Sequence, residues 1–249
     1  MLNLISHYRI AALTSLVVLL SVSTVSPATL SVIQNSVEAA AHLKRGKLLF
    51  YKNDFAGAIE DYNKAIELRP NWAEAYLQRG MARRMYGQLD GSIADYDKAS
   101  ELDPKTTQNN RSVAEAYTNH GQILATNSEL ENAITDFNKA LKLYAADLKP
   151  YYERAQARLL LEDLNNALAD YDTYLNQEKS DPFNRARAYL ERGLTKHLLG
   201  RDQEGNKDAE EGLKLAGEYS KDLVLALAFL EQRIKTLHQI RAQQQKAVG

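Results

Sequence analysis

The most regularly spaced polar side chains of the sequence are acidic and basic residues sixteen positions apart. Five basic residues are each followed at this distance by an aspartate: Arg45, Arg79, His120, Arg154 and Arg192 precede Asp61, Asp95, Asp136, Asp170 and Asp208. Such groups form charge-assisted hydrogen bonds, or they present a row of cations to an anionic ligand. Because a binding site seldom needs the same pair at every interval, we expect these pairs to be structural and to fix the stacking of neighbouring elements.

Other groups that carry catalysis or bind metals are sparse in the sequence. The chain has no Cys, which excludes disulfides, thiolate-bound metals and a cysteine nucleophile. It lacks a Gly-rich phosphate loop, a His-Glu-x-x-His pair and a Gly-x-Ser-x-Gly turn. The five His residues are dispersed, and the adjacent Glu210 and Glu211 point in different directions on a helix. We therefore predict a protein that is not an enzyme, with no catalytic residue, no cofactor and no metal.

The amino-acid composition is typical of a helical globular protein and disfavours one class of partner. Of 249 residues, 31 are Lys or Arg and 32 are Asp or Glu, so the net charge of -1 disfavours a nucleic-acid partner. Apolar residues make up 45% and charged residues 25%, values typical of a soluble globular protein. Only 5 Pro and 12 Gly are present, which favours helix throughout.

The N-terminal segment differs from the rest and predicts a signal peptide over residues 1–28. Its apolar run, residues 10–22, is shorter than the roughly 20 residues of a membrane-crossing helix. Ser26 and Ala28 place small residues where signal peptidase binds, so the mature chain is expected to begin near Thr29, with a linker over 29–38. The protein is then exported to a periplasm, the cell exterior or a lumen. The alternative is an uncleaved membrane anchor through residues 10–25.

A period of 34 residues divides most of the remaining chain. Residues 58–70 are similar to residues 92–104, further copies lie at 133–143 and 167–172, and a weaker copy lies at 205–209. A second periodic block precedes each copy, so each unit is predicted to be two helices, with units at 39–72, 73–106, 114–147, 148–181 and 186–219. The turns within the units are expected at Asn53, Gly87, Ser128, Glu162 and Gly200. Two spacers, 107–113 and 182–185, are expected to form longer loops or extra turns of the following helix.

These units resemble the tetratricopeptide repeat (TPR), a 34-residue helix–turn–helix unit. Position 8 of each unit is small, being Gly46, Gly80, Gly121, Ala155 and Gly193, and so is position 20, at Ala58, Ser92, Ala133, Ala167 and Gly205. Position 24 is aromatic in the first four units, at Tyr62, Tyr96, Phe137 and Tyr171. The resemblance covers roughly 180 residues and implies an all-α fold, a right-handed superhelix of stacked helix pairs.

The segment after residue 219 predicts a cap on this superhelix. Apolar residues recur at spacings of three and four, at Leu223, Leu227, Leu230, Ile234 and Leu237. This pattern is typical of a helix that buries one face, and the last unit of a solenoid exposes an apolar face that needs a cover. We expect a capping helix and a polar tail over residues 220–249.

The TPR resemblance also implies a function and a site. Positions 2, 5, 9, 12 and 13 of the first helices line a concave groove in TPR proteins, which makes Lys47, Phe50, Tyr51, Met81, Arg84, Met85, Gln122 and Tyr152 candidate peptide-binding residues. A chaperone tail is not expected, because Leu43 and Glu115 stand where the chaperone-binding members have cations. The sequence predicts an exported scaffold or adaptor that holds a partner protein segment in this groove. A structural protein that self-associates through its C-terminal helix is the alternative, and Phe50 or Tyr51 packing against residues 29–38 is the competing explanation of those aromatics.

Overall fold

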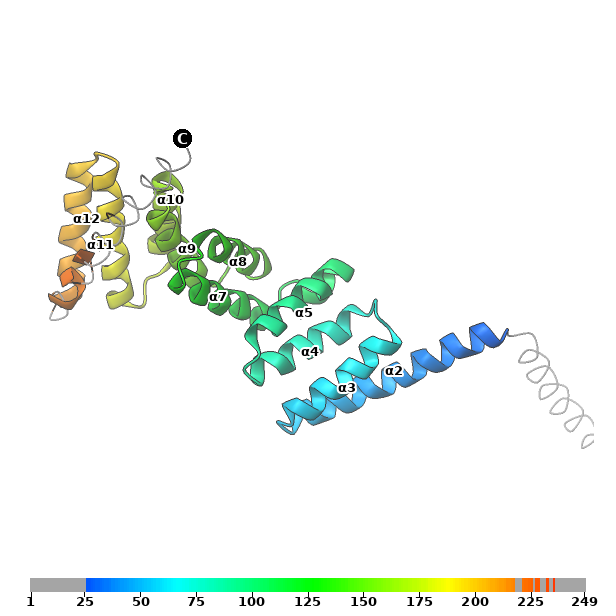
Figure 1. Cartoon of the computed structure of the whole chain (residues 1–249). Helices are drawn as coiled ribbons and strands as arrows, with labels where there is room; N and C mark the ends of the chain where they lie inside the picture. The colour runs from blue at the N-terminus through cyan, green and yellow to red at the C-terminus, as the bar shows by residue number, and fades with distance from the viewer. Residues whose placement is uncertain (1–25, 218–220, 226, 229–231, 233–234, 236–249) are drawn as a thin grey trace, which may run out of the picture.

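The computed structural model describes residues 26–217 and, beyond them, residues 221–225, 227, 228, 232 and 235. All regular elements of this part of the chain are helices. They stack as successive antiparallel pairs along an elongated, curved molecule, and the predicted all-α TPR superhelix is confirmed (Figure 1). Residues 1–25, which hold most of the predicted signal peptide and the alternative anchor, lie outside the described residues. None of the described helices has both the length and the apolar character needed to cross a membrane.

A pair of helices lies at each predicted unit, and the first helices α2, α7 and α11 begin before the predicted bounds. The first helices are α2 (Pro27–Tyr51), α4 (Ala73–Met85), α7 (Arg111–Thr126), α9 (Lys149–Leu160) and α11 (Pro182–Leu198). The second helices are α3 (Phe55–Leu68), α5 (Leu89–Leu102), α8 (Leu130–Leu143), α10 (Leu164–Gln177) and α12 (Asp202–Ala216). The first spacer contains the end of a short helix, α6 (Pro104–Thr107), and the start of α7, whereas residues 182–185 form the first turn of α11.

The first helix, α2, is longer than the repeat requires. We expected a linker over residues 29–38, whereas these residues are helical and extend α2 past the end of α3 (Figure 1). The cause lies at the helix start. The Ser26 side chain accepts a hydrogen bond from the Thr29 backbone N–H, and Pro27 follows at the first helical position, where its fixed φ suits a helix. The predicted cleavage site after Ala28 therefore falls within the first turn of α2.

The turns between paired helices lie where the sequence predicts them. Asn53, Gly87, Ser128, Glu162 and Gly200 all have positive φ, between 62° and 87°. This left-handed conformation ends one helix and redirects the chain into the next. Its free energy is higher for a residue with a side chain, such as Ser128, than for glycine.

Close packing of paired helices explains the small residues. A Cβ on Gly46, Gly80 or Gly121 would lie 2.6–2.7 Å from the ring of Tyr62, Tyr96 or Phe137, respectively, the aromatic residue at position 24 of the same unit. The glycine therefore makes room for the ring. In the fifth unit position 24 is Ala209, and the backbones themselves approach instead: a Cβ on Gly193 would lie 2.9 Å from the Gly205 carbonyl oxygen.

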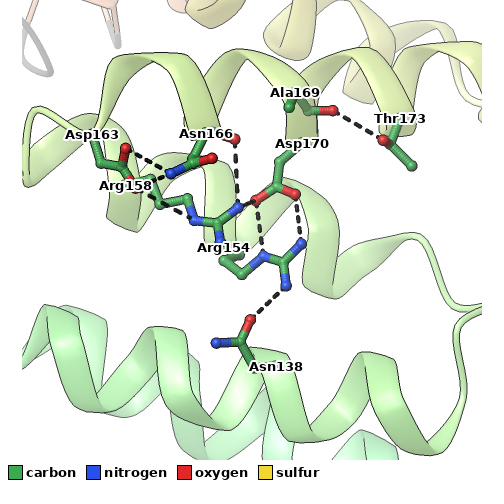
Figure 2. Close-up of polar contacts among 8 residues, drawn as sticks. All are labelled: Asn138, Arg154, Arg158, Asp163, Asn166, Ala169, Asp170 and Thr173. Carbon is green, nitrogen blue, oxygen red and sulfur yellow. Dashed lines mark hydrogen bonds and ion pairs between the residues drawn. The ribbon is translucent and has the colours of Figure 1, made fainter.

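The sixteen-residue pairs form within each unit and not between units. Arg154 donates to both carboxylate oxygens of Asp170, from Nε at 2.9 Å and from Nη2 at 2.6 Å, and Arg158 donates to the same carboxylate at 2.6 Å (Figure 2). The corresponding bonds join Arg45 to Asp61, Arg79 to Asp95, His120 to Asp136 and Arg192 to Asp208. All five aspartates are buried, so these pairs are structural, as expected, although each arginine pairs within its own unit.

A third bond of the same arginines joins neighbouring units. The Nη1 of Arg154 donates to Asn138 of the preceding unit (Figure 2). Arg79 reaches Asn63 at 2.8 Å, and Arg192 reaches Asp172 at 2.7 Å. One guanidinium thus holds its own helix pair and the preceding one, because its five N–H donors fit two partners at once.

The third unit departs from this pattern because His120 replaces the arginine. Asp97 of the preceding unit is then bound by Lys139 at 2.6 Å and by the Tyr117 hydroxyl at 2.8 Å. Burial raises the pKa of Asp136, while the hydrogen bond from His120 opposes the rise. In the first unit, the hydrogen bonds from Arg45 lower the pKa of Asp61. The pKa of this position is therefore raised in the third unit, where burial has the largest effect, and lowered in the first unit, where the hydrogen bonds from Arg45 have the largest effect.

The C-terminal end is described only in part. Leu223 is buried against Ala186, Leu190 and Ala216, and Leu227 packs against the same cluster. These contacts lie on the last helix pair, where a cap is expected. Most of residues 229–249, including Leu230, Ile234 and Leu237, lie outside the described residues, so the capping helix stays a prediction.

Candidate protein-binding groove

Most of the predicted groove residues in the first two units make contacts within the protein. Lys47 forms an ion pair with Glu74, and the Phe50 ring packs edge-on to Phe55 at 5.4 Å. Met81 is half-buried beside the core cluster that includes Leu77 and Tyr96, and the Nε of Arg84 is buried. Tyr51 and Met85 are the large apolar members of the predicted set that remain exposed, at 81% and 51%.

The two candidates of the later units lie closer to the interior than expected. Gln122 donates to Glu153 at 2.7 Å, which joins the first helices of the third and fourth units. Tyr152 is only 8% exposed, and its hydroxyl donates to Glu191 at 2.8 Å. Its ring is flanked by those of Tyr171 and Tyr174, so it packs as a core residue with one edge on the groove.

A cavity of about 510 Å³ lies at the N-terminal ends of α9 and α11. Its three cationic side chains lie on the first helices of three successive helix pairs, at Arg111 on α7, Lys149 on α9 and Arg187 on α11. A second hollow of about 320 Å³ adjoins it and shares Arg111, Asp147 and Lys149. We call the two together the α7–α11 groove. Lys149 and Arg187 stand at position 2 of the fourth and fifth units, one of the groove-lining positions, but are not among the predicted candidates.

Acidic residues alternate with these cations around the groove. Asp147, Glu153 and Glu178 line the cavity beside Arg111, Lys149 and Arg187, so its charges are balanced. Burial raises the pKa of Glu153, and hydrogen bonds from the Ser180 side chain and backbone lower the pKa of Glu178. The lining of the cavity is therefore polar and carries charges of both signs.

Arg187 is held in place by a buried network that sequence reasoning missed. Its guanidinium lies 5.4 Å from the centre of the Tyr152 ring and 3.9 Å from Glu191. The Glu191 carboxylate is buried and accepts hydrogen bonds from Tyr152, Gln156 and Tyr171. Burial raises its pKa, and Arg187 and the hydrogen bonds oppose that rise. The recurrence of Glu at position 6 of the last two units, at Glu153 and Glu191, was the available signal.

The comparisons with known proteins agree with the repeated helix pairs of the fold. A sequence model described as TPR repeat matches residues 46–84, and one described as Tetratricopeptide repeat matches residues 73–106 and 114–147. The chain is a tetratricopeptide repeat protein. The last two matches span the same residues that the 34-residue period delimits as the second and third units of this TPR protein.

Solved structures of TPR proteins show the same fold. The crystal structure of MamA protein shares 25% identity with this chain, with a TM-score of 0.51, and the alignment covers 74% of this chain and 94% of that one. The crystal structure of YrrB, described as a TPR protein with an unusual peptide-binding site, shares 18% identity, with a TM-score of 0.55, and covers 81% of this chain and 97% of that one. No curated protein sequence matches this chain.

Proposed function

We propose that this TPR protein is a non-enzymatic adaptor that holds a segment of a partner protein in the α7–α11 groove. The observation that carries the proposal is the cavity itself, which is large, open to solvent and lined by three cations and three carboxylates from successive units. Repeat surfaces of this kind bind extended or helical segments through many polar contacts along rigid helices. The fold supports a role in protein–protein interaction, and the balanced charge favours a partner segment of mixed charge.

The test is a charge reversal on the rim of the groove. Lys149 is exposed and lines both hollows, so Lys149→Glu changes the groove without disturbing the core. Lys207→Glu, on the exposed surface of α12, is the matched control. We expect Lys149→Glu to weaken capture of the native partner by at least about fivefold, the effect of roughly 1 kcal/mol at an interface. Equal capture by both variants, at unchanged circular dichroism, would remove the groove from the proposal.

The proposal includes export by the N-terminal segment. The short apolar run and the small residues Ser26 and Ala28 support cleavage by signal peptidase. Intact-mass measurement of the protein from its host is expected to give a chain that begins at Thr29. An unprocessed chain that remains with the membrane fraction would favour the anchor through residues 10–25.

The alternative function, self-association through the C-terminal helix, depends largely on residues outside the described part of the chain. Leu223 and Leu227 already contact the last helix pair, which supports a capping role for this segment more than a role in contacts with another chain. Gel filtration with light scattering on a chain truncated after Gly217 distinguishes the two. Loss of solubility supports the cap, whereas loss of an oligomer with a soluble, helical product supports self-association.

A further inference from the structure

Helix α2 differs from an ordinary outer helix of a solenoid because it is apolar on two faces. Its buried residues Ala39, Leu43 and Gly46 face α3 and form the first helix pair. The opposite side of the helix faces solvent, where residues are usually polar, but here it carries a second apolar row. This row consists of Leu30, Ile33, Val37, Ala41, Leu48 and Tyr51, and we call it the α2 stripe.

The α2 stripe is exposed along nearly the whole helix and is interrupted by one charged residue, Lys44. Its residues recur at spacings of three, four and seven, so with 3.6 residues per turn they lie within about 80° of one another around the axis. Its large side chains are 49–81% exposed, from Leu30 to Tyr51. Residues 30 to 51 span about 32 Å at the helical rise. A stripe of this length and spacing is typical of a helix that pairs with another helix.

The composition of the α2 stripe fits a second copy of itself in antiparallel orientation. If Leu30 of one copy lies beside Tyr51 of the other, Ile33 lies beside Leu48 and Val37 beside Lys44. The small residues Ala40 and Ala41 then fall at the two-fold axis, where they allow the helices to approach closely. Each contact occurs twice, as the symmetry of an isologous dimer requires.

Charge selects this orientation over the parallel one. Lys44 is the charged residue on the seam, and parallel pairing in register would set it against Lys44 of the second copy. Antiparallel pairing sets it instead against Val37 and next to Glu38 of the second copy, and Glu38 is itself exposed, with 55% of its side chain accessible. Opposite charges across a helix seam favour a pairing, whereas like charges disfavour it.

We propose that the chain forms a homodimer through antiparallel pairing of the α2 stripe, with the two-fold axis at Ala40 and Ala41. The two solenoids then extend away from a shared α2 pair and leave both α7–α11 grooves open. The dimer holds two partner segments at once, which raises avidity for a partner that carries repeated segments.

The experiment is disulfide crosslinking in the full chain, which has no Cys of its own. Ala41→Cys places the two thiols at the axis, within the Cα separation of about 4.4–6.8 Å that a disulfide needs, and is expected to give a covalent dimer under mild oxidation. Leu30→Cys alone is expected to give none, because the two residues would lie about 32 Å apart. Coexpressed Leu30→Cys and Tyr51→Cys chains are expected to crosslink to each other.

Two further variants test the apolar and charged parts of the seam in the Ala41→Cys background. Leu48→Glu is expected to lower the dimer yield by at least about tenfold, because the interface loses one apolar Leu48 side chain from each copy. Ile123→Glu, at a site 50% exposed on α7, is the matched control and is expected to leave it unchanged. Glu38→Lys is expected to lower the yield, and adding Lys44→Glu is expected to restore it.

Several outcomes overturn the proposal. Crosslinking of Leu30→Cys to itself shows a parallel pair. A covalent product with a different protein shows another occupant of the α2 stripe, and absence of any Ala41→Cys product, while circular dichroism shows a folded chain, shows that no copy pairs there.

Discussion

Replacement of Asp170 by asparagine tests whether the sixteen-residue pairs stabilise the solenoid. The Asp170 carboxylate accepts three short hydrogen bonds from two guanidinium groups, two from Arg154 and one from Arg158, and its side chain is only 5% exposed (Figure 2). Asparagine keeps the shape and one acceptor oxygen, so the substitution removes the charge and leaves the packing in place.

The expected loss is large for a single substitution. Removing one partner of a buried ion pair costs about 3–5 kcal/mol, because the other charge stays buried without compensation. The retained carbonyl oxygen and the partial exposure of Arg154 and Arg158, at 14% and 18%, favour the lower end of that range. We therefore expect a loss of about 3 kcal/mol, a substantial part of the roughly 5–15 kcal/mol of a typical folded domain.

Chemical denaturation followed by circular dichroism gives the overall loss, and amide hydrogen exchange locates it. Because a solenoid unfolds by units, we expect faster exchange in α9 and α10 before the more distant helices. Asp90→Asn, at a side chain 97% exposed, is the control and is expected to change stability by less than about 0.5 kcal/mol. A loss below about 1 kcal/mol for Asp170→Asn, or equal losses for both variants, would refute the view that this pair stabilises the fold.

Three other substitutions test separate parts of the argument. Gly121→Ala places a Cβ 2.7 Å from the Phe137 ring and is expected to cost about 1–3 kcal/mol in thermal or chemical unfolding. Ser128→Gly relieves a φ of 67° and is expected to gain about 1 kcal/mol, whereas Ser128→Ala is expected to gain nothing. Glu191→Gln is expected to flatten the pH dependence of stability. Burial raises the pKa of Glu191 in the folded state, so the folded state binds the proton more tightly than the unfolded state does. The contribution of Glu191 to the free energy of unfolding therefore falls as the pH rises above about 4.3, the pKa of an unperturbed Glu, towards the raised pKa. Wild-type and variant unfolding curves that keep the same pH slope would contradict this assignment.

The helix pairs and their turns were predictable because their causes are local. The 34-residue period, the small residues and the turn positions each describe contacts within one unit, and every unit repeats them. Thus Asn53, Gly87, Ser128, Glu162 and Gly200 were located from residue type and spacing alone, and positive φ at all five confirms them. The sixteen-residue pairs were found for the same reason, since the two helices of a unit keep a constant register.

Contacts between different units depended on the tertiary structure. The sequence does not reveal that Arg154 reaches Asn138 of the preceding unit, or that Glu191 is buried beneath Tyr152. Both depend on how one helix pair rotates on the next, and no single unit encodes that rotation. The groove is a product of the same stacking, because Arg111, Lys149 and Arg187 lie on the first helices of three successive helix pairs.

The exposure of the first helix was also decided in three dimensions. From the sequence, the apolar residues of 29–38 belonged to a linker and Tyr51 to a groove. The two segments instead form one helix, α2, and α3 covers only one of its faces. Sequence alone determined that this TPR protein is a row of helix pairs, because the pattern of each pair is local. Only the packing of pair on pair determined which side chains remain available to a partner, because burial is a property of the whole stack.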